Sequence, residues 1–280
     1  SIMRGFFYSH QNIGTRNHRA GQSRVKPLAH ARVLLLRTRE QARPVTALLS
    51  ALGATTLASP ATRIVPLLST PARRAALAAL PGDHDWVALA SVHAVEHLFA
   101  ALAADGRDAR ALAGCRIAVV GHETHRALER EGLGADLVPD VHSAAGLAAA
   151  LLAGAHRPRH VLLPRAEDGR PELEDALVNS GVRVTSLPLY RTEGRSAAEL
   201  AEVCTALRER RVDIALFFAP SQVKALCAAL GADASAELSA VPVLAALGPT
   251  TANALRDFGL RVDVVPSSPA PSLLCTNIAE

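Results

Sequence analysis

The sequence contains the nine residues Val120-Gly121-His122-Glu123-Thr124-His125-Arg126-Ala127-Leu128, which read as an apolar strand end, a glycine and the start of a helix. The same pattern returns 127 residues later as Leu247-Gly248-Pro249-Thr250-Thr251-Ala252-Asn253-Ala254-Leu255. At least nine identities share this offset, and at least five more share an offset of 128. The nine are at Gly121, Thr124, Ala127, Leu128, Gly132, Leu133, Asp136, Val138 and Pro139, and the five at Arg37, Gly53, Pro60, Asp85 and Val95. A period this long predicts two similar lobes with a cleft between them, rather than a repeat array.

Short apolar runs alternate with Ala- and Leu-rich helical stretches from residue 32 onward. The runs are continuously apolar, as in strands that are covered by helices on both faces. We therefore expect an α/β fold with two parallel sheets, each covered on both faces by helices. The expected strands are 33–36, 86–90, 117–120, 161–163, 214–218 and 243–247. The expected helices include 41–52, 94–103, 124–130, 172–179, 198–210 and 250–258, and Gly53, Gly132, Gly181 and Gly259 follow four of them as left-handed caps.

The basic charge is concentrated at the N-terminus. Residues 1–30 carry five basic residues and no acid, whereas the other 25 Lys and Arg face 26 Asp and Glu, so the net charge of +4 divides into +5 and −1. A body so close to neutral argues against nucleic acid as the main partner. We expect residues 1–30 to be a basic, disordered extension. Its composition also loosely resembles an organellar transit peptide, and a start-site artefact is a third interpretation.

Other common chemistries lack their motifs. The chain has no Gly-x-x-x-x-Gly-Lys-Ser/Thr loop, no Gly-x-Gly-x-x-Gly and no Gly-x-Ser-x-Gly. His93 and His97 are four residues apart, but no clear third ligand accompanies them, so we expect helix-surface histidines and no metal or cofactor. The four cysteines are scattered and no apolar run approaches the ~20 residues of a membrane span, which predicts a cytoplasmic protein that does not bind membranes.

Each copy places similar polar residues where its strands end, at the edge where α/β sheets bind ligands. An arginine follows one strand, a small polar turn follows another, and a glycine and threonine open a helix after a third. These residues are Arg37 and Arg165, Ser91 and Ser221, and Thr124, Thr250 and Thr251. Arginines and free helix-start amides both bind anions, so the set predicts a polyanionic ligand. The alternative is that the hydroxyls of Ser91, Thr124, Ser221 and Thr250 are only helix N-caps.

The segment Leu187-Pro188-Leu189-Tyr190-Arg191-Thr192 contains one of the two tyrosines of the chain. By itself, Tyr190 at the end of a strand is typical of a packing residue with a hydrated hydroxyl. In the repeat, however, Pro188 aligns with Pro60 and Tyr190 aligns with Thr62. The tyrosine is thus a difference between two otherwise similar copies, and this makes a functional role for Tyr190 a second interpretation.

Several segments resemble the uroporphyrinogen-III synthase family, and together they run from about residue 32 to residue 278. The most specific are Leu187-Pro188-Leu189-Tyr190-Arg191-Thr192 and Leu247-Gly248-Pro249-Thr250-Thr251-Ala252. Val33-Leu34-Leu35-Leu36-Arg37, Asp85-Trp86-Val87 and Pro164-Arg165-Ala166-Glu167-Asp168-Gly169-Arg170 add to the series. The resemblance implies a cofactor-free, monomeric lyase that cyclises hydroxymethylbilane to uroporphyrinogen III with inversion of ring D and loss of water, in haem biosynthesis. Transient contact with hydroxymethylbilane synthase is implied as well.

The resemblance also implies roles for individual residues. Tyr190 would help the hydroxyl to leave, Arg37 and Arg165 would bind carboxylates, and five hydroxyls would face the substrate: Ser91, Thr124, Ser221, Thr250 and Thr251. It implies that each lobe is completed by crossing over, with lobe 1 formed by 32–61 plus 194–280 and lobe 2 by 64–190, and that a two-segment hinge joins the lobes. Hydroxyls usual in the family are replaced at Ala90 and Ala219. A rival interpretation is therefore a two-lobed polycarboxylate-binding or regulatory module that has lost turnover.

Overall fold

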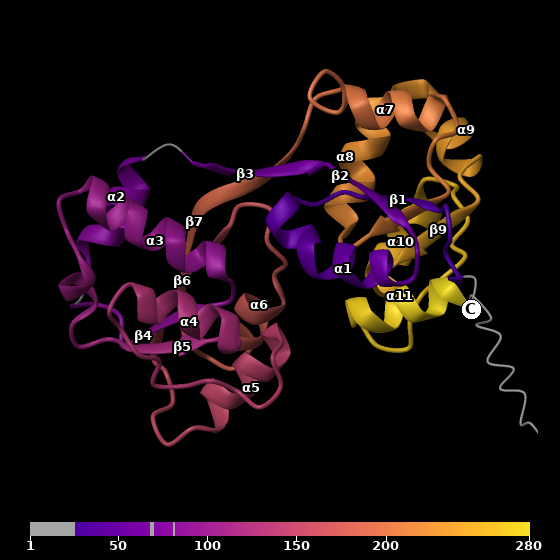
Figure 1. The fold of residues 1–280 in the computed structure, drawn as a ribbon. Coiled ribbons are helices and arrows are strands. Elements are labelled where there is room, and N and C mark those ends of the chain that lie inside the picture. The colour runs from indigo at the N-terminus through magenta and orange to yellow at the C-terminus, as the bar shows by residue number, and fades with distance from the viewer. Residues whose placement is uncertain (1–25, 68–69, 81) are drawn as a thin grey trace, which may run out of the picture.

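The strands of the computed structural model form two separate sheets, each the centre of one lobe (Figure 1). The structure describes residues 26–67, 70–80 and 82–280, so most of the expected basic extension lies outside it. Lobe 1 contains β1 (Arg32–Leu35), β2 (Thr55–Ala58), β8 (Ile214–Phe217) and β9 (Val243–Ala246) in the order β2-β1-β8-β9, all parallel. Lobe 2 contains β3 (Thr62–Pro66), β4 (Trp86–Leu89), β5 (Arg116–Val119), β6 (His160–Ala166) and β7 (Arg183–Gly194) in the order β3-β7-β6-β4-β5.

Each sheet exchanges halves of the two sequence copies. In lobe 1, β1 and β2 of the first copy share a sheet with β8 and β9 of the second, joined where β1 pairs with β8. In lobe 2, β4 and β5 of the first copy share a sheet with β6 and β7 of the second, joined where β4 pairs with β6. The chain crosses between the lobes after β2 and again after β7. At this crossing β3 and β7 form an antiparallel ribbon in which Thr62 pairs with Gly194 and Pro66 with Tyr190. Figure 1 shows this ribbon reaching from lobe 2 to lobe 1.

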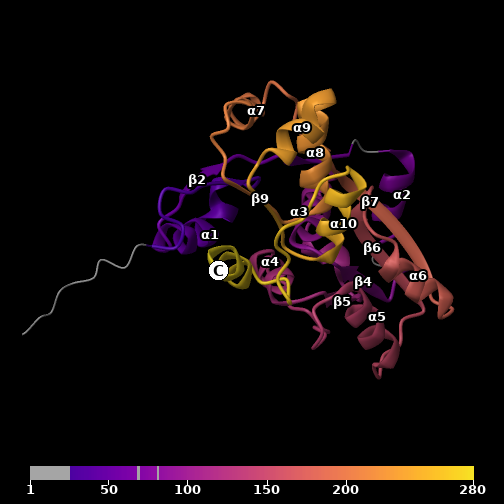
Figure 2. The same ribbon diagram turned by 90° about the vertical axis from the view of Figure 1, so that its right-hand side faces the viewer.

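Helices cover both faces of both sheets because alternate strand residues enter opposite cores. In lobe 1, Val33 and Leu35 pack against α1 (Arg39–Ala51) and α11 (Pro271–Ala279), which lie side by side (Figure 2). The other face packs against α7 (Ala201–Arg208), α8 (Pro220–Leu230), α9 (Ala234–Ser239) and α10 (Pro249–Asp257). In lobe 2, one face is covered by α2 (Pro71–Ala78), α3 (Val92–Ala104) and α4 (His122–Arg130), the other by α5 (Ala144–Ala153) and α6 (Glu172–Asn179). None of the helices in the described part of the chain could span a bilayer.

The predicted fold class is confirmed, with one departure. All six expected strands are present, and Gly53, Gly132, Gly181 and Gly259 all have the positive φ of a left-handed cap. The sheets are parallel as expected except at β3, which runs antiparallel to its neighbour β7. β2 and β3 were not expected, because both are short edge strands with polar, partly exposed residues that lack an apolar run.

Four aspartates close the strand ends that point away from the other lobe. Asp213 accepts the backbone N–H of Arg32 (2.8 Å), and Asp85 accepts those of Arg159 (2.9 Å) and His160 (2.8 Å). In lobe 2, Asp136 accepts the backbone N–H of Ile117 in β5 at 2.7 Å. In lobe 1, Asp263 accepts the backbone N–H of Leu244 in β9, also at 2.7 Å. These aspartates are matched pairs of the repeat, so the two copies use the same carboxylates to satisfy the first amides of their sheets.

We predict that Asp85→Asn lowers the free energy of unfolding at neutral pH by about 1–2 kcal/mol, because it weakens two charge-assisted bonds at once. Burial acts to raise the pKa of Asp85, but hydrogen bonds from Arg159 and His160 outweigh it and hold the pKa below the ordinary value. A carboxylate with a depressed pKa stabilises the fold above its unfolded pKa of about 3.9 and loses this contribution as the pH falls below it.

Denaturant unfolding at a series of pH values measures the effect. The difference between wild type and Asp85→Asn should shrink below about pH 4. Asp140→Asn changes an exposed aspartate and is the matched control. An equal loss of stability in both variants, or a difference that persists at low pH, would contradict the assignment.

Candidate functional site

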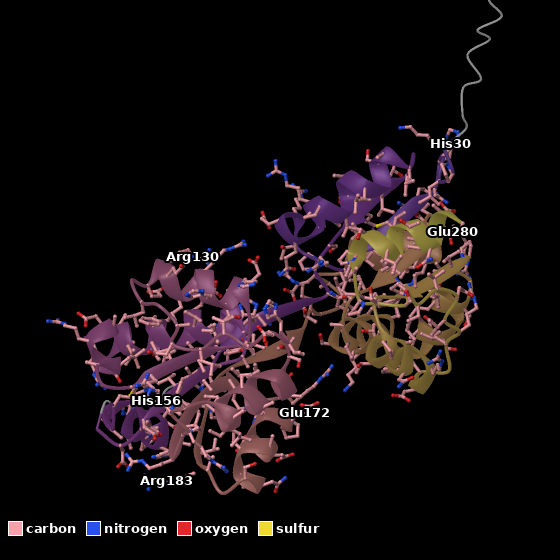
Figure 3. The ribbon with its side chains drawn as sticks, turned by 90° about the horizontal axis from the view of Figure 1, so that it is seen from below. His30, Arg130, His156, Glu172, Arg183 and Glu280 are labelled. Carbon is pink, nitrogen blue, oxygen red and sulfur yellow. The ribbon has the colours of Figure 1, made fainter. Side chains whose placement is uncertain are left out.

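The carboxyl ends of the strands in the two lobes face each other. In Figure 3, His30, which precedes β1, lies on the outer side of lobe 1. His156 and Arg183, at the starts of β6 and β7, lie on the outer side of lobe 2, whereas Glu172, beyond the end of β6, lies toward lobe 1. In α/β sheets the ligand sits outside the carboxyl ends, so the region between the lobes is the candidate site.

Two neighbouring cavities open at this edge. The tyrosine cavity, of about 410 Å³, lies within lobe 2 and is lined by Ser91, Arg165 and Tyr190 together with the start of α5. The interlobe cavity, of about 570 Å³, is lined by residues of both lobes, among them Thr62 and Ser221. Both cavities are bordered by Ala166, Gly169 and Arg170, so the loop after β6 separates them. Volumes of this size are ordinary for small-molecule sites.

The Tyr190 hydroxyl is hydrogen-bonded to the Ser91 hydroxyl at 2.9 Å. Ser91 is the N-cap of α3, and its Oγ also accepts the backbone N–H of Ala94 at 3.0 Å. The two hydroxyls have two hydrogens, and one of them is used in the bond between them. Whichever residue donates that bond, the other hydroxyl hydrogen remains available to a group in the tyrosine cavity. The pair can therefore act as a hydrogen-bond or proton donor.

Tyr190 is almost fully enclosed, with 6% of its surface exposed. Burial raises the pKa of Tyr190 above its ordinary value, although the hydrogen bond with Ser91 acts in the opposite direction. The phenol therefore keeps its proton at neutral pH and is a donor rather than a base. Tyr190 has the burial of a packing residue, yet its hydroxyl meets Ser91 beside the cavity, so the two interpretations of the sequence are compatible.

Arg165 is engaged by protein groups. Its guanidinium forms an ion pair with Glu174 and donates to the carbonyl oxygens of Gly169, Ala166 (3.3 Å) and Arg170 (3.2 Å). It thereby closes the loop that separates the two cavities. The expected contact between Arg165 and a ligand carboxylate would have to compete with Glu174.

Arg37 is in the opposite situation. It lies between β1 and α1, and its guanidinium carbon sits 4.6 Å from the centre of the Phe218 ring. Burial lowers the pKa of Arg37, which nevertheless keeps its charge at neutral pH. Within the described residues no carboxylate pairs with Arg37. This cation at the carboxyl end of lobe 1 is free to meet an anion, although it lines neither cavity.

The four predicted hydroxyl residues other than Ser91 lie just inside helix starts. The N-caps there are Ala219, Gly121 and Gly248, so Thr124, Ser221 and Thr250 are not N-caps. Ser91 is an N-cap, but its hydroxyl also bonds Tyr190. Ser221 lines the interlobe cavity, Thr250 is exposed, and Thr124 and Thr251 are buried. Glycine and alanine caps leave the first helix amides without a side-chain acceptor, which suits an anionic ligand.

Sequence reasoning missed several polar residues of the interlobe cavity, which include Asp168. Arg170 and Lys224 bring positive charge from opposite lobes, and no partner of either side chain is found in the part of the chain that the structure describes. Thr62 and Thr192 bring hydroxyls from β3 and β7. Lys224 carried a usable signal, since the chain has only two lysines. Thr192 lies in a segment that resembles the family, whereas nothing in the sequence pointed to Thr62 as a binding residue, because the ribbon that presents it depends on long-range pairing.

Comparison with known proteins gives a consistent result. A family model described as uroporphyrinogen-III synthase HemD matches residues 44–275. A uroporphyrinogen-III synthase of Synechococcus elongatus is 32% identical over 250 residues, which cover 85% of this chain and 90% of that protein. A crystal structure of a mutant uroporphyrinogen III synthase from Thermus thermophilus has a TM-score of 0.60 and 26% identity, covering 89% of this chain and 97% of that one. The uroporphyrinogen-III synthetase of Helicobacter pylori, 16% identical with a TM-score of 0.58, shares the fold over 89% of this chain and 98% of its own.

We predict that Arg165→Ala and Arg37→Ala differ in their effect on stability. Removing Arg165 frees the loop after β6 and leaves Glu174 partly buried without its cation, which should lower the free energy of unfolding by about 1–3 kcal/mol. Removing Arg37 costs a stacked cation, about 0.5–1 kcal/mol. Urea unfolding of both variants tests this, and an equal effect would show that Arg165 is as free as Arg37.

Proposed function

Because the chain belongs to the uroporphyrinogen-III synthase family, we propose that it converts hydroxymethylbilane to uroporphyrinogen III. The linear tetrapyrrole closes with inversion of ring D and loss of water, which makes the enzyme a cyclising lyase. The observation that carries the proposal is the Ser91–Tyr190 pair, whose spare hydroxyl hydrogen adjoins a cavity large enough for part of a tetrapyrrole.

The pair supplies the proton for the first step. As the carbon–oxygen bond of the terminal hydroxymethyl group breaks, the departing oxygen takes a proton from the Ser91–Tyr190 pair and leaves as water. The pyrrole nitrogen supplies the electron pair that replaces the broken bond, which gives an azafulvenium cation that keeps its N–H, and the hydroxyl pair is left with one proton fewer. Ring D then attacks through its substituted carbon, and the spiro intermediate fragments and closes again. The carbon that completes the macrocycle releases a proton, which restores the hydroxyl pair.

The remaining residues bind and fold the substrate. Arg170 and Lys224 face the interlobe cavity and suit the carboxylates of the tetrapyrrole, as does Arg37 at the edge of lobe 1. Ser221 and the helix starts near Thr124, Thr250 and Thr251 offer hydroxyls and amides. Orientation of a flexible chain supplies much of such a rate enhancement, because a correctly folded substrate loses little further entropy in reaching the transition state.

The lobes move as units in this proposal. Lobe 1 comprises 32–61 plus 194–280 and lobe 2 comprises 64–190, and the two connections near the β3–β7 ribbon allow the lobes to close on the substrate. The enzyme acts as a cytoplasmic monomer. It receives its labile substrate through transient contact with hydroxymethylbilane synthase, since hydroxymethylbilane also closes spontaneously to the type I isomer.

Isomer analysis of the product tests the activity. Purified protein given freshly prepared hydroxymethylbilane should yield the type III isomer, separated chromatographically from type I. Formation of type I alone would contradict the proposal. Tight binding of the polycarboxylate without turnover would instead identify the non-catalytic module that Ala90 and Ala219 allow.

We predict that Tyr190→Phe lowers kcat about tenfold with KM changed less than twofold. This falls short of the 10²–10⁴ of a well-matched general acid, because a phenol is a weak acid and Ser91 keeps a hydroxyl. Tyr190→Phe combined with Ser91→Ala should cost more than either change alone, because it removes both hydrogens. Steady-state kinetics with Tyr8→Phe as the control, the only other tyrosine, checks this. An unchanged kcat in the double variant would remove the pair from the mechanism.

A further inference from the structure

Helix α3 encloses Tyr190 with three of its side chains. Ser91 at the N-cap holds the hydroxyl, and His97 lies against the ring with 4.8 Å between centroids and 22° between planes. His93 approaches the same ring edge-on, with 6.0 Å between centroids. His93 and His97 are four residues apart, so they lie on one helix face and point toward the same strand. The proposed mechanism uses Ser91 and leaves the histidines without a role.

We propose that His97 is a positioning residue for the reaction, holding the phenol ring of Tyr190 so that its hydroxyl stays on Ser91 and at the edge of the tyrosine cavity. This inference rests on the role proposed above for Tyr190. His97 acts through Tyr190 and does not itself touch the substrate.

The backbone at Tyr190 is irregular and cannot fix the ring by itself. The pairing of β6 with β7 shifts register at this point, where Arg165 pairs with Pro188 but Ala166 pairs with Tyr190. The opposite neighbour, β3, ends here, with Pro66 as the partner of Tyr190. A ring at such a shift gains its orientation from the side chains that pack on it. The flat contact with His97 blocks rotation of the phenol about its own axis, since any turn would drive ring atoms into the imidazole.

The surroundings of His97 favour a neutral imidazole. Burial, and to a lesser extent the neighbouring His93, lower the pKa of His97, whereas Glu96 acts in the opposite direction. Glu96 is itself paired with His93 at 3.0 Å. On the other side His97 borders an apolar cavity of about 510 Å³, where Arg73 of α2 and Asp105 after α3 are the further charged groups. A neutral ring beside the phenol keeps the Tyr190 proton in place, whereas an imidazolium would favour its loss.

The test reads Tyr190 directly. In a Tyr8→Phe background Tyr190 is the single tyrosine, so the near-ultraviolet absorbance of tyrosinate titrates this residue alone. His97→Ala should expose the ring and lower the pKa of Tyr190 toward the ordinary value near 10. His97→Phe keeps a flat, neutral ring and should preserve the raised pKa. Circular dichroism across the titration verifies that each variant stays folded.

Kinetics of the same variants completes the test. His97→Ala should lower kcat about two- to tenfold, the range expected for one aromatic contact, with KM nearly unchanged. His97→Phe should restore kcat to within twofold, and His93→Ala, which removes only the edge contact, is the matched control. If His97→Ala does not fold, His97→Leu fills the volume without a flat ring and takes its place.

The outcomes separate the two proposals. An unchanged Tyr190 pKa in His97→Ala, or a kcat that falls as far in His97→Phe as in His97→Ala, would overturn the positioning role. A wild-type enzyme that forms only the type I isomer would refute the proposed function. In that case the titration still decides whether His97 holds Tyr190.

Discussion

Carboxylates at the outer ends of the two sheets bind strands from different copies of the repeat. Asp213, of the second copy, holds the first amide of β1, and Asp85, of the first, holds the amides at the start of β6. These bonds satisfy backbone donors that would otherwise lie unpaired at the sheet edge, and they also join the exchanged halves. With the outer ends fixed in this way, the opposite ends of both sheets are left to face each other. The candidate site lies between these facing ends of the two sheets.

In the proposed mechanism, the chemistry of the site depends on a difference between copies that otherwise match. Both lobes end their strands with hydroxyls, cations and open helix starts, which suits a ligand with many carboxylates. Only lobe 2 adds Tyr190, and the aligned position in the other copy, Thr62, sits on the antiparallel strand beside it. An asymmetric reaction on a nearly symmetric scaffold requires such a difference. It occurs on the ribbon that connects the lobes, where a change in one lobe can reach the other.

The fold and the family were predictable from sequence, whereas the contacts that individual side chains make were not. Continuous apolar runs and the repeat predicted six strands and two sheets, because burial on both faces leaves a strong signal, whereas the exchange of halves was expected only from the family resemblance. The edge strands β2 and β3 were not predicted, because they are short and polar and lack the apolar run that marks a buried strand. Arg165 looked like Arg37 in sequence, yet one is engaged by Glu174 and the other stacks on Phe218. Contacts of this kind join residues that are brought together only when the chain has folded, so the sequence around each arginine does not reveal them.

The exchange of halves also determines the order in which the two sheets can form during synthesis. As the chain leaves the ribosome, the sheet of lobe 2 is complete once Gly194 has emerged, because its five strands lie between residues 62 and 194. Of the strands that the structure describes, β1 and β2 are made first, and they must wait for β8 and β9, which begin more than 150 residues after β2 ends. Until then, β1 has an open edge made of Val33, Leu34 and Leu35. Although β1 is translated before the other described strands, it is thus among the last to be paired, and in a nascent chain its open apolar edge is a binding site for a chaperone.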